Sequence, residues 1–379
     1  MLLKNCNIIF LNKIEKGSIL IENNIIKEIN PSEVNDKTVI DCKGLFVSPG
    51  FIDIHIHGAG GHDTMDGTFE AINEISKTIC KYGTTSFTPT TMTMSKEDIL
   101  KSMMAIKKAK INGTDGAIVL GAHLEGPFIS PSAIGAQNPN YLIAPSYENF
   151  KSMTGDAMDA VVSITMAPEV EGAKELASVL SSKGIRCSIG HTKATYEEAI
   201  DGIKCGFCHS THLFNAMTGF THREPGVVGA TFDTDITTET ISDGIHISYP
   251  SLRVVYKQKG TDKTLLVTDA MCACGMPDGT YSLGGQPVTV KSGAARLNNG
   301  ALAGSILTLN KSIKNIHNNT NYPLYEIVKM ASYNGAKYCR VDDKKGQIKE
   351  NFDADLTIFD ENIDVKMTII GGKIVYNTL

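Results

Sequence analysis

Apolar positions in the middle of this chain switch repeatedly between a period of about two residues and a period of about 3.6 residues. The switching predicts strand–helix units around a parallel sheet, because parallel strands need crossover connections. Eight strands are expected, at Gly50–His57, Thr84–Thr88, Ala117–Leu124, Val161–Met166, Ile185–Gly190, Cys208–Leu213, Thr238–Ser242 and Leu265–Asp269. Eight units in this length favour an α/β fold of the (β/α)8 TIM-barrel type over the alternative, a doubly wound open sheet.

The two ends of the chain show a different pattern. Residues 2–29 hold β-branched runs interrupted by Asn23-Asn24, and residues 355–377 hold further runs on either side of Gly371-Gly372. Such pairs between apolar runs are typical of tight hairpin turns. We therefore expect both ends to build one small β domain. A hairpin excursion is expected at residues 278–299, which are rich in Gly and β-forming residues.

Two helix starts follow from capping residues. Ser95 and Thr195 are expected N-caps because Asp98 and Glu198, three residues further on, complete capping boxes. Each box predicts that its helix begins at the next residue.

Composition and charge exclude several classes of protein. The net charge of -5 is spread without long like-charge runs, so no positive surface is expected to gather nucleic acid or an anionic membrane. The start of the chain lacks the apolar core of a signal peptide, and no apolar stretch approaches ~18 residues, so we expect a cytoplasmic protein. Nine cysteines at irregular spacing indicate reduced thiols.

The first expected barrel strand carries the first chemical signal. Asp53, His55 and His57 alternate with three isoleucines, so the polar side chains share one face, which would line the barrel lumen. Burying that face is costly unless something coordinates it, and two imidazoles at this spacing suit one divalent metal. Hydrogen-bonded core histidines are the alternative explanation of this pair alone.

Four further segments each place a ligand-type residue at the end of an expected strand. They are Glu125 in HLEGPF, His191 in SIGHT, His212 in STHLFNAM and Asp269 in LVTDAM. Catalytic groups of this barrel class lie at the carboxyl ends of strands, so these residues should meet at one mouth. A cap or a core hydrogen bond would explain any one of them but not the whole set. Residues 205–209 match CxxCH, the sequence motif of haem attachment. Because no export signal is expected, we interpret Cys205 and Cys208 as thiols that pack around the sixth strand.

Together with REPG, the DGIH of residues 243–246 and the closing DADLTIFD, these segments resemble the amidohydrolase superfamily, and within it the N-acetylglucosamine-6-phosphate deacetylase family. The resemblance extends along essentially the whole chain. It implies a β-sandwich domain from residues 1–48 and 346–379, a barrel over residues 49–345, and a homodimer. It also implies metal-dependent hydrolysis of N-acetylglucosamine 6-phosphate to glucosamine 6-phosphate and acetate, in amino-sugar catabolism and cell-wall recycling.

The same resemblance implies roles for individual residues. Glu125, His191 and His212 would hold the primary metal. His55 and His57 stand where some members carry Gln and Asn and keep a single metal, so one or two divalent ions per subunit are expected, zinc first, with iron or manganese as alternatives. The implied substrate contacts are Ala136, Gln137, Asn215, Ala216, Arg223, His246, Leu302, Ala303 and Gly304.

Asp269 is the expected general base, taking a proton from water and returning it to the leaving amine. Gln137 stands where members often carry His, and because an amide cannot become charged, it is expected to bind rather than to act as an acid. The planar fork of Arg223 suits phosphate, although a surface ion pair with Glu224 is the alternative.

Rival functions remain at this stage. The closest are deacetylation of N-acetylgalactosamine 6-phosphate and hydrolysis of a cyclic amide. A silent binding protein on the same fold is the rival of a different class, and it would be expected to lack a metal ligand or Asp269. Neither is missing from the sequence.

Overall fold

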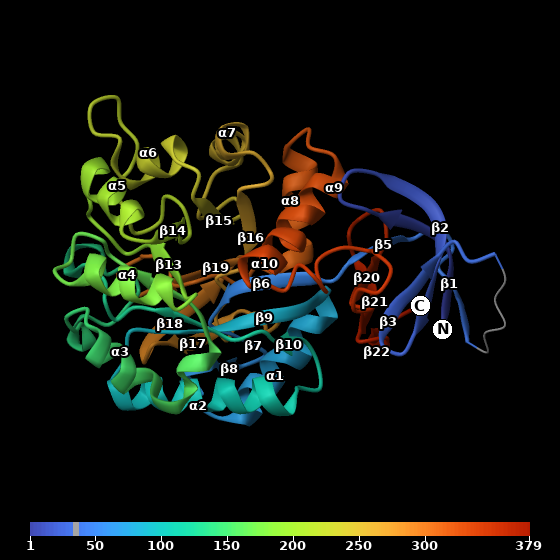
Figure 1. The fold of residues 1–379 in the computed structure, drawn as a ribbon, viewed down its shortest axis with the longest axis horizontal. Helices are drawn as coiled ribbons and strands as arrows, with labels where there is room; N and C mark the ends of the chain where they lie inside the picture. The colour runs from blue at the N-terminus through green and yellow to red at the C-terminus, as the bar shows by residue number, and fades with distance from the viewer. Residues whose placement is uncertain (33–37) are drawn as a thin grey trace.

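The computed structural model describes residues 1–32 and 38–379, and its larger part is a closed barrel of parallel strands (Figure 1). The barrel strands are β6 Phe51–Ile56, β9 Thr84–Thr91, β11 Ala122–Glu125, β12 Val161–Met166, β13 Arg186–Ile189, β14 Phe207–Ser210, β15 Thr237–Ile241 and β16 Thr264–Val267. Each strand pairs with the next in sequence order, and Ala270, just beyond β16, bridges Ile56 to close the ring. The predicted (β/α)8 barrel is confirmed.

Several expected strands differ in extent from the prediction. The second runs to Thr91 rather than Thr88, and the eighth ends at Val267 rather than Asp269. The third is divided into β10 Ile118–Val119, which pairs only with β9, and β11, because Gly121 between them has a φ of 152°. The sixth ends at Ser210 rather than at Leu213. His212 has a φ of 29°, in the left-handed region, which cannot continue an extended strand.

Helices surround the barrel, and their apolar faces pack against its outer surface (Figure 1). They are α1 Phe69–Ile79, α2 Lys96–Asn112, α3 Tyr147–Thr154, α4 Ala173–Ser182, α5 Tyr196–Lys204, α6 Gly226–Asp233, α7 Tyr249–Lys259, α8 Leu309–Asn319, α9 Leu324–Ala331 and α10 Tyr333–Tyr338. The reciprocal capping box of Thr195 and Glu198 is confirmed. The Ser95 hydroxyl also caps its helix, because it accepts the Asp98 backbone N–H. This box is not reciprocal, since the Asp98 carboxylate accepts from the Ser95 hydroxyl and not from the Ser95 backbone N–H.

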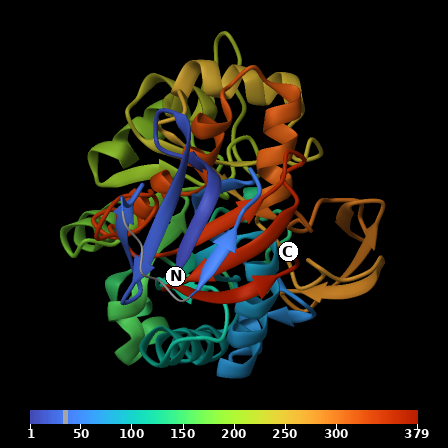
Figure 2. The same cartoon turned by 90° about the vertical axis from the view of Figure 1, so that its right-hand side faces the viewer.

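Both ends of the chain form a separate sheet with its own apolar core, drawn in blue and red in front of the barrel in Figure 2. Its strands are β1 Leu2–Ile9, β2 Ile14–Glu22, β3 Ile25–Ile29, β4 Val39–Asp41, β5 Phe46–Pro49, β20 Leu356–Phe359, β21 Val365–Ile370 and β22 Lys373–Asn377. Antiparallel pairing of β5 with β20 joins the two ends. The predicted β domain from both termini is confirmed, whereas its exact boundary residues stay a prediction.

The two expected hairpin turns have the backbone that their residues favour. Asn23 and Asn24, between β2 and β3, have φ values of 51° and 69°. Gly371 and Gly372, between β21 and β22, have φ values of 52° and 72°. Two successive positive φ angles are the signature of a type I′ hairpin turn.

The expected excursion after the eighth strand is a three-stranded antiparallel sheet of β17 Gly279–Leu283, β18 Gln286–Lys291 and β19 Ala294–Leu297. It projects to the side of the barrel in Figure 2 and packs its inner face against Met92 and Met271. The side-chain amide of Gln286 donates to the Ala136 carbonyl at 2.7 Å. The excursion therefore forms part of the wall around the barrel mouth. None of the helices described here is long and apolar enough to span a membrane.

Candidate active site

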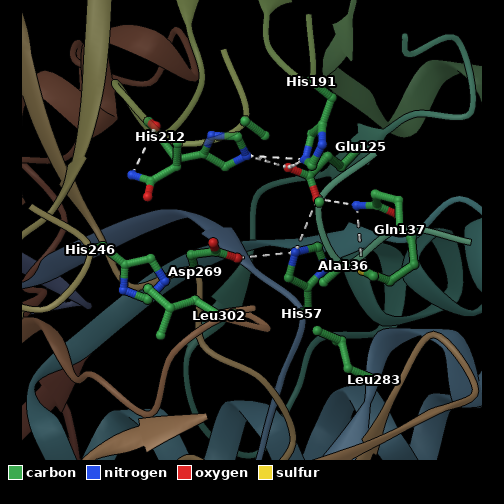
Figure 3. A pocket seen from close by; sticks show the side chains of 15 residues that line it. His57, Glu125, Ala136, Gln137, His191, His212, His246, Asp269, Leu283 and Leu302 are labelled. Atoms are coloured by element: carbon green, nitrogen blue, oxygen red, sulfur yellow. Dashed lines mark hydrogen bonds and ion pairs between the residues drawn. The ribbon is translucent and has the colours of Figure 1, made fainter. Parts of the chain in front are cut away.

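The carboxyl ends of the barrel strands bring the predicted ligands together in one place (Figure 3). These ligands are His55 in β6, His57 just after it, Glu125 at the end of β11, and His191 and His212 after β13 and β14. They form two groups that share Glu125, and within each group the ligand atoms lie within 4.8 Å of one another. Nε2 of His191 and of His212 lie 3.2 Å and 2.9 Å from Glu125 Oε1, and Nε2 of His57 lies 3.3 Å from Glu125 Oε2.

Three of the predicted metal-ligating and catalytic residues have an unusual backbone conformation. His191, His212 and Asp269 have φ values of 47°, 29° and 49°. Residues with a Cβ rarely occupy this region, at a cost on the order of 1–3 kcal/mol, and they persist there only where surrounding contacts hold them. The His212 N–H donates to Glu239 Oε2 at 3.0 Å, and the Asp269 N–H donates to the His55 carbonyl at 2.9 Å. The turn at each strand end aims the side chain into the mouth.

Three of the four imidazoles have Nδ1 next to an oxygen that can only accept a hydrogen bond. The pairs are His55 with the Glu239 carboxylate at 2.9 Å, His57 with the Thr90 carbonyl at 3.2 Å, and His191 with the Ala133 carbonyl at 3.0 Å. Each Nδ1 therefore carries its proton, and each Nε2 presents a lone pair to the centre of the site.

The carboxylates and imidazoles of the site stabilise one another's charges. Burial alone would lower the pKa of His57, but hydrogen bonds with the Asp269 and Glu125 carboxylates raise it to about 9. Burial alone would raise the pKa of Glu125, but the surrounding imidazoles hold it well below its usual value. Positive charge is thus stabilised at Nε2, where a divalent metal can replace protons. Imidazole nitrogens with carboxylate oxygens are a ligand set that suits zinc, iron or manganese.

Asp269 lies on the open side of the ligand set (Figure 3). Its Oδ1 is 3.2 Å from His57 Nε2 and 3.5 Å from His55 Nε2, and its side chain keeps 12% of its surface exposed. Burial alone would raise the pKa of Asp269, but the neighbouring imidazoles lower it, so the carboxylate is ionised and can accept a proton. This placement is compatible with the predicted role of Asp269 as a general base.

The ligand set forms one wall of a cavity of about 270 Å³. Predicted substrate contacts that line this cavity are Ala136, Gln137, Asn215, Ala216, His246, Leu302 and Gly304. Gly304 has a φ of 58°, and a Cβ there would lie 2.9 Å from the Asp269 carbonyl oxygen. Only glycine allows the chain to pass this close to Asp269.

Gln137 contacts the predicted metal ligand Glu125 as well as lining the cavity. Its Nε2 donates to Glu125 Oε2 at 2.7 Å, and its Oε1 accepts the Thr93 N–H at 2.7 Å. Both polar atoms of the buried amide are therefore used within the protein, which fixes its orientation. This arrangement favours positioning of Glu125 in addition to any substrate contact.

His246 is oriented by the other residue of the DGIH segment. Its Nδ1 lies 2.6 Å from Asp243 Oδ2, and the same aspartate accepts the His246 backbone N–H through Oδ1 at 2.8 Å. The Asp243 carboxylate thus fixes the ring at Nδ1, and His246 lines the cavity. The ring suits recognition of a sugar hydroxyl.

Two predicted contacts lie outside the cavity lining. Ala303 is fully buried and packs in the apolar cluster of the excursion, between the lining residues Leu302 and Gly304. Arg223 is exposed on the loop before α6. No ion pair joins Arg223 to Glu224, and both residues belong to the described part of the chain. The alternative explanation of Arg223 as half of a surface pair is thus not seen.

Four residues of the site were not predicted: Glu239, Met92, Leu283 and Gly135, which precedes the predicted contact Ala136. Glu239, in β15, is 1% exposed and contacts His55 and the His212 backbone. An acidic residue inside an expected strand was the available signal, since strands are depleted in Glu. Met92 and Leu283 line the cavity but lie far apart in sequence, and an apolar residue in a strand or hairpin carries no signal of its own.

A barrel with histidines and carboxylates gathered at the carboxyl ends of its strands is the architecture of a metal-dependent hydrolase. Residues 46–375 match the amidohydrolase family, and the chain belongs to this family. Among its relatives, the N-acetylglucosamine-6-phosphate deacetylase of Lysinibacillus sphaericus is 41% identical over 89% of this chain and 88% of its own length. The enzyme of that name from Bacillus subtilis (strain 168) is 38% identical over 99% and 97%. The crystal structure of N-acetylglucosamine-6-phosphate deacetylase from Pasteurella multocida superposes with a TM-score of 0.94 at 32% identity, over 99% of both chains.

Proposed function

We propose that this chain hydrolyses the N-acetyl group of N-acetylglucosamine 6-phosphate, releasing acetate and glucosamine 6-phosphate. The observation that carries the proposal is the convergence of four imidazoles around Glu125, three of which line one cavity with Asp269 at its open side. The family is metal-dependent, and its relatives that cover nearly the whole chain carry the name of this activity.

The residues of the site divide the reaction between them. A bound divalent metal supplies Lewis acidity, which activates water and polarises the amide carbonyl. Glu125, His191 and His212 would hold that metal, and His55 and His57 would hold a second ion or strengthen the first site. Asp269 takes the proton of the attacking water and then returns it to the departing nitrogen, so the same carboxyl group acts as base and acid.

The cavity suggests an orientation for the substrate. The turn over residues 213–216 has positive φ values at Phe214 and Ala216, and turns of this kind present backbone N–H groups to anions. This end, with Asn215, would hold the phosphate, and Arg223 on the exposed loop before α6 would have to turn inward to contact it. The amide then lies at the ligands, and its acyl methyl group points toward Met92 and Leu283.

The finer properties follow from the resemblance of the sequence. Zinc is the expected ion, iron and manganese are the alternatives, and one or two ions per subunit are expected. A cytoplasmic homodimer is expected to be the working form. Metal analysis of the purified protein and light scattering on a size-exclusion column would decide these points.

Acetate release from three substrates tests the proposed function. N-acetylglucosamine 6-phosphate should be the best substrate, with its galactosamine epimer and unphosphorylated N-acetylglucosamine both poorer. Equal rates on the two epimers would contradict specificity for the glucosamine epimer and would indicate a general deacetylase of phosphorylated amino sugars. Absence of acetate release from all three, by protein shown to contain metal, would contradict it.

A further inference from the structure

Glu239 is a buried carboxylate outside the ligand set, and the hydrogen-bond donors that face it come from site histidines and one neighbour. Its Oε2 accepts from Nδ1–H of His55 at 2.9 Å and from the His212 backbone N–H at 3.0 Å. Its Oε1 faces Nε2 of His209 at 3.2 Å. In the described part of the chain, no lysine or arginine forms an ion pair with it. Burying a carboxylate is costly, and among the described residues only imidazoles form ion pairs with this one. The cost indicates that Glu239 has a function at this position.

His209 completes the carboxylate's surroundings from the other side. Its Nδ1 lies 2.6 Å from the hydroxyl of Thr237, so a neutral ring that accepts the hydroxyl proton donates Nε2–H to Glu239. All three groups around Glu239 are then donors. The carboxylate is held in one orientation, with Oε2 turned toward the site.

One oxygen of Glu239 touches both metal-ligand groups. Through the His55 ring it reaches the group of His55, His57 and Glu125, and it fixes the tautomer that leaves Nε2 of His55 unprotonated. Through the His212 N–H it reaches the group of Glu125, His191 and His212, at a residue whose φ of 29° must be held by its contacts.

We propose that Glu239 is a positioning residue that fixes His55 and the His212 backbone together and thereby keeps both metal-ligand groups ready to bind. It acts through these histidines and does not touch the reacting atoms. The proposal rests on the proposed function only in requiring that this site binds a divalent metal. Partners of this kind typically change metal affinity by roughly 10- to 100-fold when they are removed.

The test is metal affinity rather than turnover. Apo-protein is titrated with Co²⁺ at buffered free concentrations, metal per subunit is measured by mass spectrometry, and the visible Co²⁺ spectrum reports the ligand geometry. Glu239→Gln keeps the shape but loses the charge, and it should weaken Co²⁺ binding by roughly 10- to 100-fold. Glu239→Asp keeps the charge at a shorter reach, should bind with intermediate affinity, and serves as the second variant if Glu239→Gln does not fold.

A matched control separates positioning from a general loss of stability. Asp355 is another buried carboxylate, in the terminal sheet, where it pairs with Lys345 far from the site. Asp355→Asn should lower the melting temperature of the apo-protein without changing Co²⁺ affinity. An equal fall in affinity for Asp355→Asn and Glu239→Gln would overturn the proposal, because the effect would then report stability alone.

A double-mutant cycle identifies the route of the effect. If Glu239 acts through His55, adding Glu239→Gln to His55→Ala should weaken Co²⁺ binding by clearly less than Glu239→Gln does alone. Fully additive losses, or unchanged affinity in a folded Glu239→Gln variant, would overturn the positioning role while leaving the proposed function intact. If the wild-type protein binds no divalent metal, the proposed function fails as well, so the two failures are distinguishable.

Discussion

The apolar wall of the cavity should limit the length of the acyl group that the enzyme removes. Met92 and Leu283 line the cavity, and each is only 2% exposed. Figure 3 shows Leu283 on the side of His57 that faces away from His246. In the proposed substrate orientation, with the phosphate near Asn215, the acyl chain would end against this wall. Met92→Ala should therefore admit a longer acyl group.

The size of the effect follows from the atoms that are removed. Met92→Ala deletes Cγ, Sδ and Cε, which is more than the space that the two extra methylenes of an N-butyryl group need. Burying two methylenes contributes about 1.6 kcal/mol at ~0.8 kcal/mol each. Forcing them into the wild-type wall costs roughly 1–3 kcal/mol, and the variant avoids that cost. The acetyl-over-butyryl preference in kcat/KM should thus fall by about 2.5–4.5 kcal/mol, or roughly 70- to 2000-fold.

The surroundings of Met92 favour the lower end of this range. Met65 Sδ accepts the Met92 N–H at 3.3 Å, and the Gln137 amide lies 3.7 Å from Met92 Sδ. Gln137 is fixed by its bonds to Glu125 and Thr93, but the Met65 side chain can relax into part of the new space, and partial collapse reduces the gain from filling a cavity. Leu283→Ala opens the same wall from the excursion and should shift the preference in the same direction.

Amine release from the N-acetyl, N-propionyl and N-butyryl derivatives of glucosamine 6-phosphate would measure this preference. Met103→Ala is the matched control, because Met103 is fully buried on α2 and does not line the cavity. It should leave the acyl preference unchanged. If Met92→Ala, with full metal content, slowed all three substrates by the same factor, the acyl group would not lie against this wall and the proposed substrate orientation would be wrong.

Three other changes test the assignment of roles. Asp269→Asn should keep its metal and lose roughly 10²- to 10⁴-fold in kcat, because the amide cannot accept the proton; acetate release near the wild-type rate would remove Asp269 from the proton transfer. His191→Ala should lose bound metal before any substrate is added, since a ligand is missing, and full metal content by elemental analysis would contradict its assignment. Arg223→Ala should lower kcat/KM for the phosphorylated sugar by roughly 30- to 1000-fold, because it removes about 2–4 kcal/mol of charge-assisted binding. It should hardly change kcat/KM for unphosphorylated N-acetylglucosamine. An equal loss on both sugars would indicate that Arg223 stabilises the fold instead of binding phosphate.

The barrel could be predicted because its signals are local. Each strand is a short apolar run between turn residues, and the alternation of His55 and His57 with isoleucines gives the facing of β6 directly. Ligand-type residues at successive strand ends also had to converge, since the carboxyl ends of parallel strands meet at one rim. The proximity of the expected ligands could therefore be predicted from the order of the strands alone.

The remaining features depend on tertiary contacts that no local pattern encodes. The end of β14 was placed too late because a positive φ at a histidine arises only from the contacts that hold it, here with Glu239 on the neighbouring strand. The dual contacts of Gln137 depend on where the loop after β11 folds back. Met92 and Leu283 meet only because the excursion packs over the barrel mouth. Each of these contacts joins segments that are far apart in the sequence, so no local pattern predicts it.

The position of Asp269 links closure of the barrel to placement of the proposed general base. Its N–H donates to the His55 carbonyl at 2.9 Å, which links the last strand to the first. Its carbonyl accepts the Ser305 N–H at 2.7 Å, and Thr268 beside it donates its hydroxyl to Asp53 at 2.6 Å. These bonds hold Asp269 at a φ that it would not adopt alone. Since the bond to His55 lies next to the Ile56–Ala270 bridge that closes the ring of strands, closure of the barrel also helps to place the proposed general base.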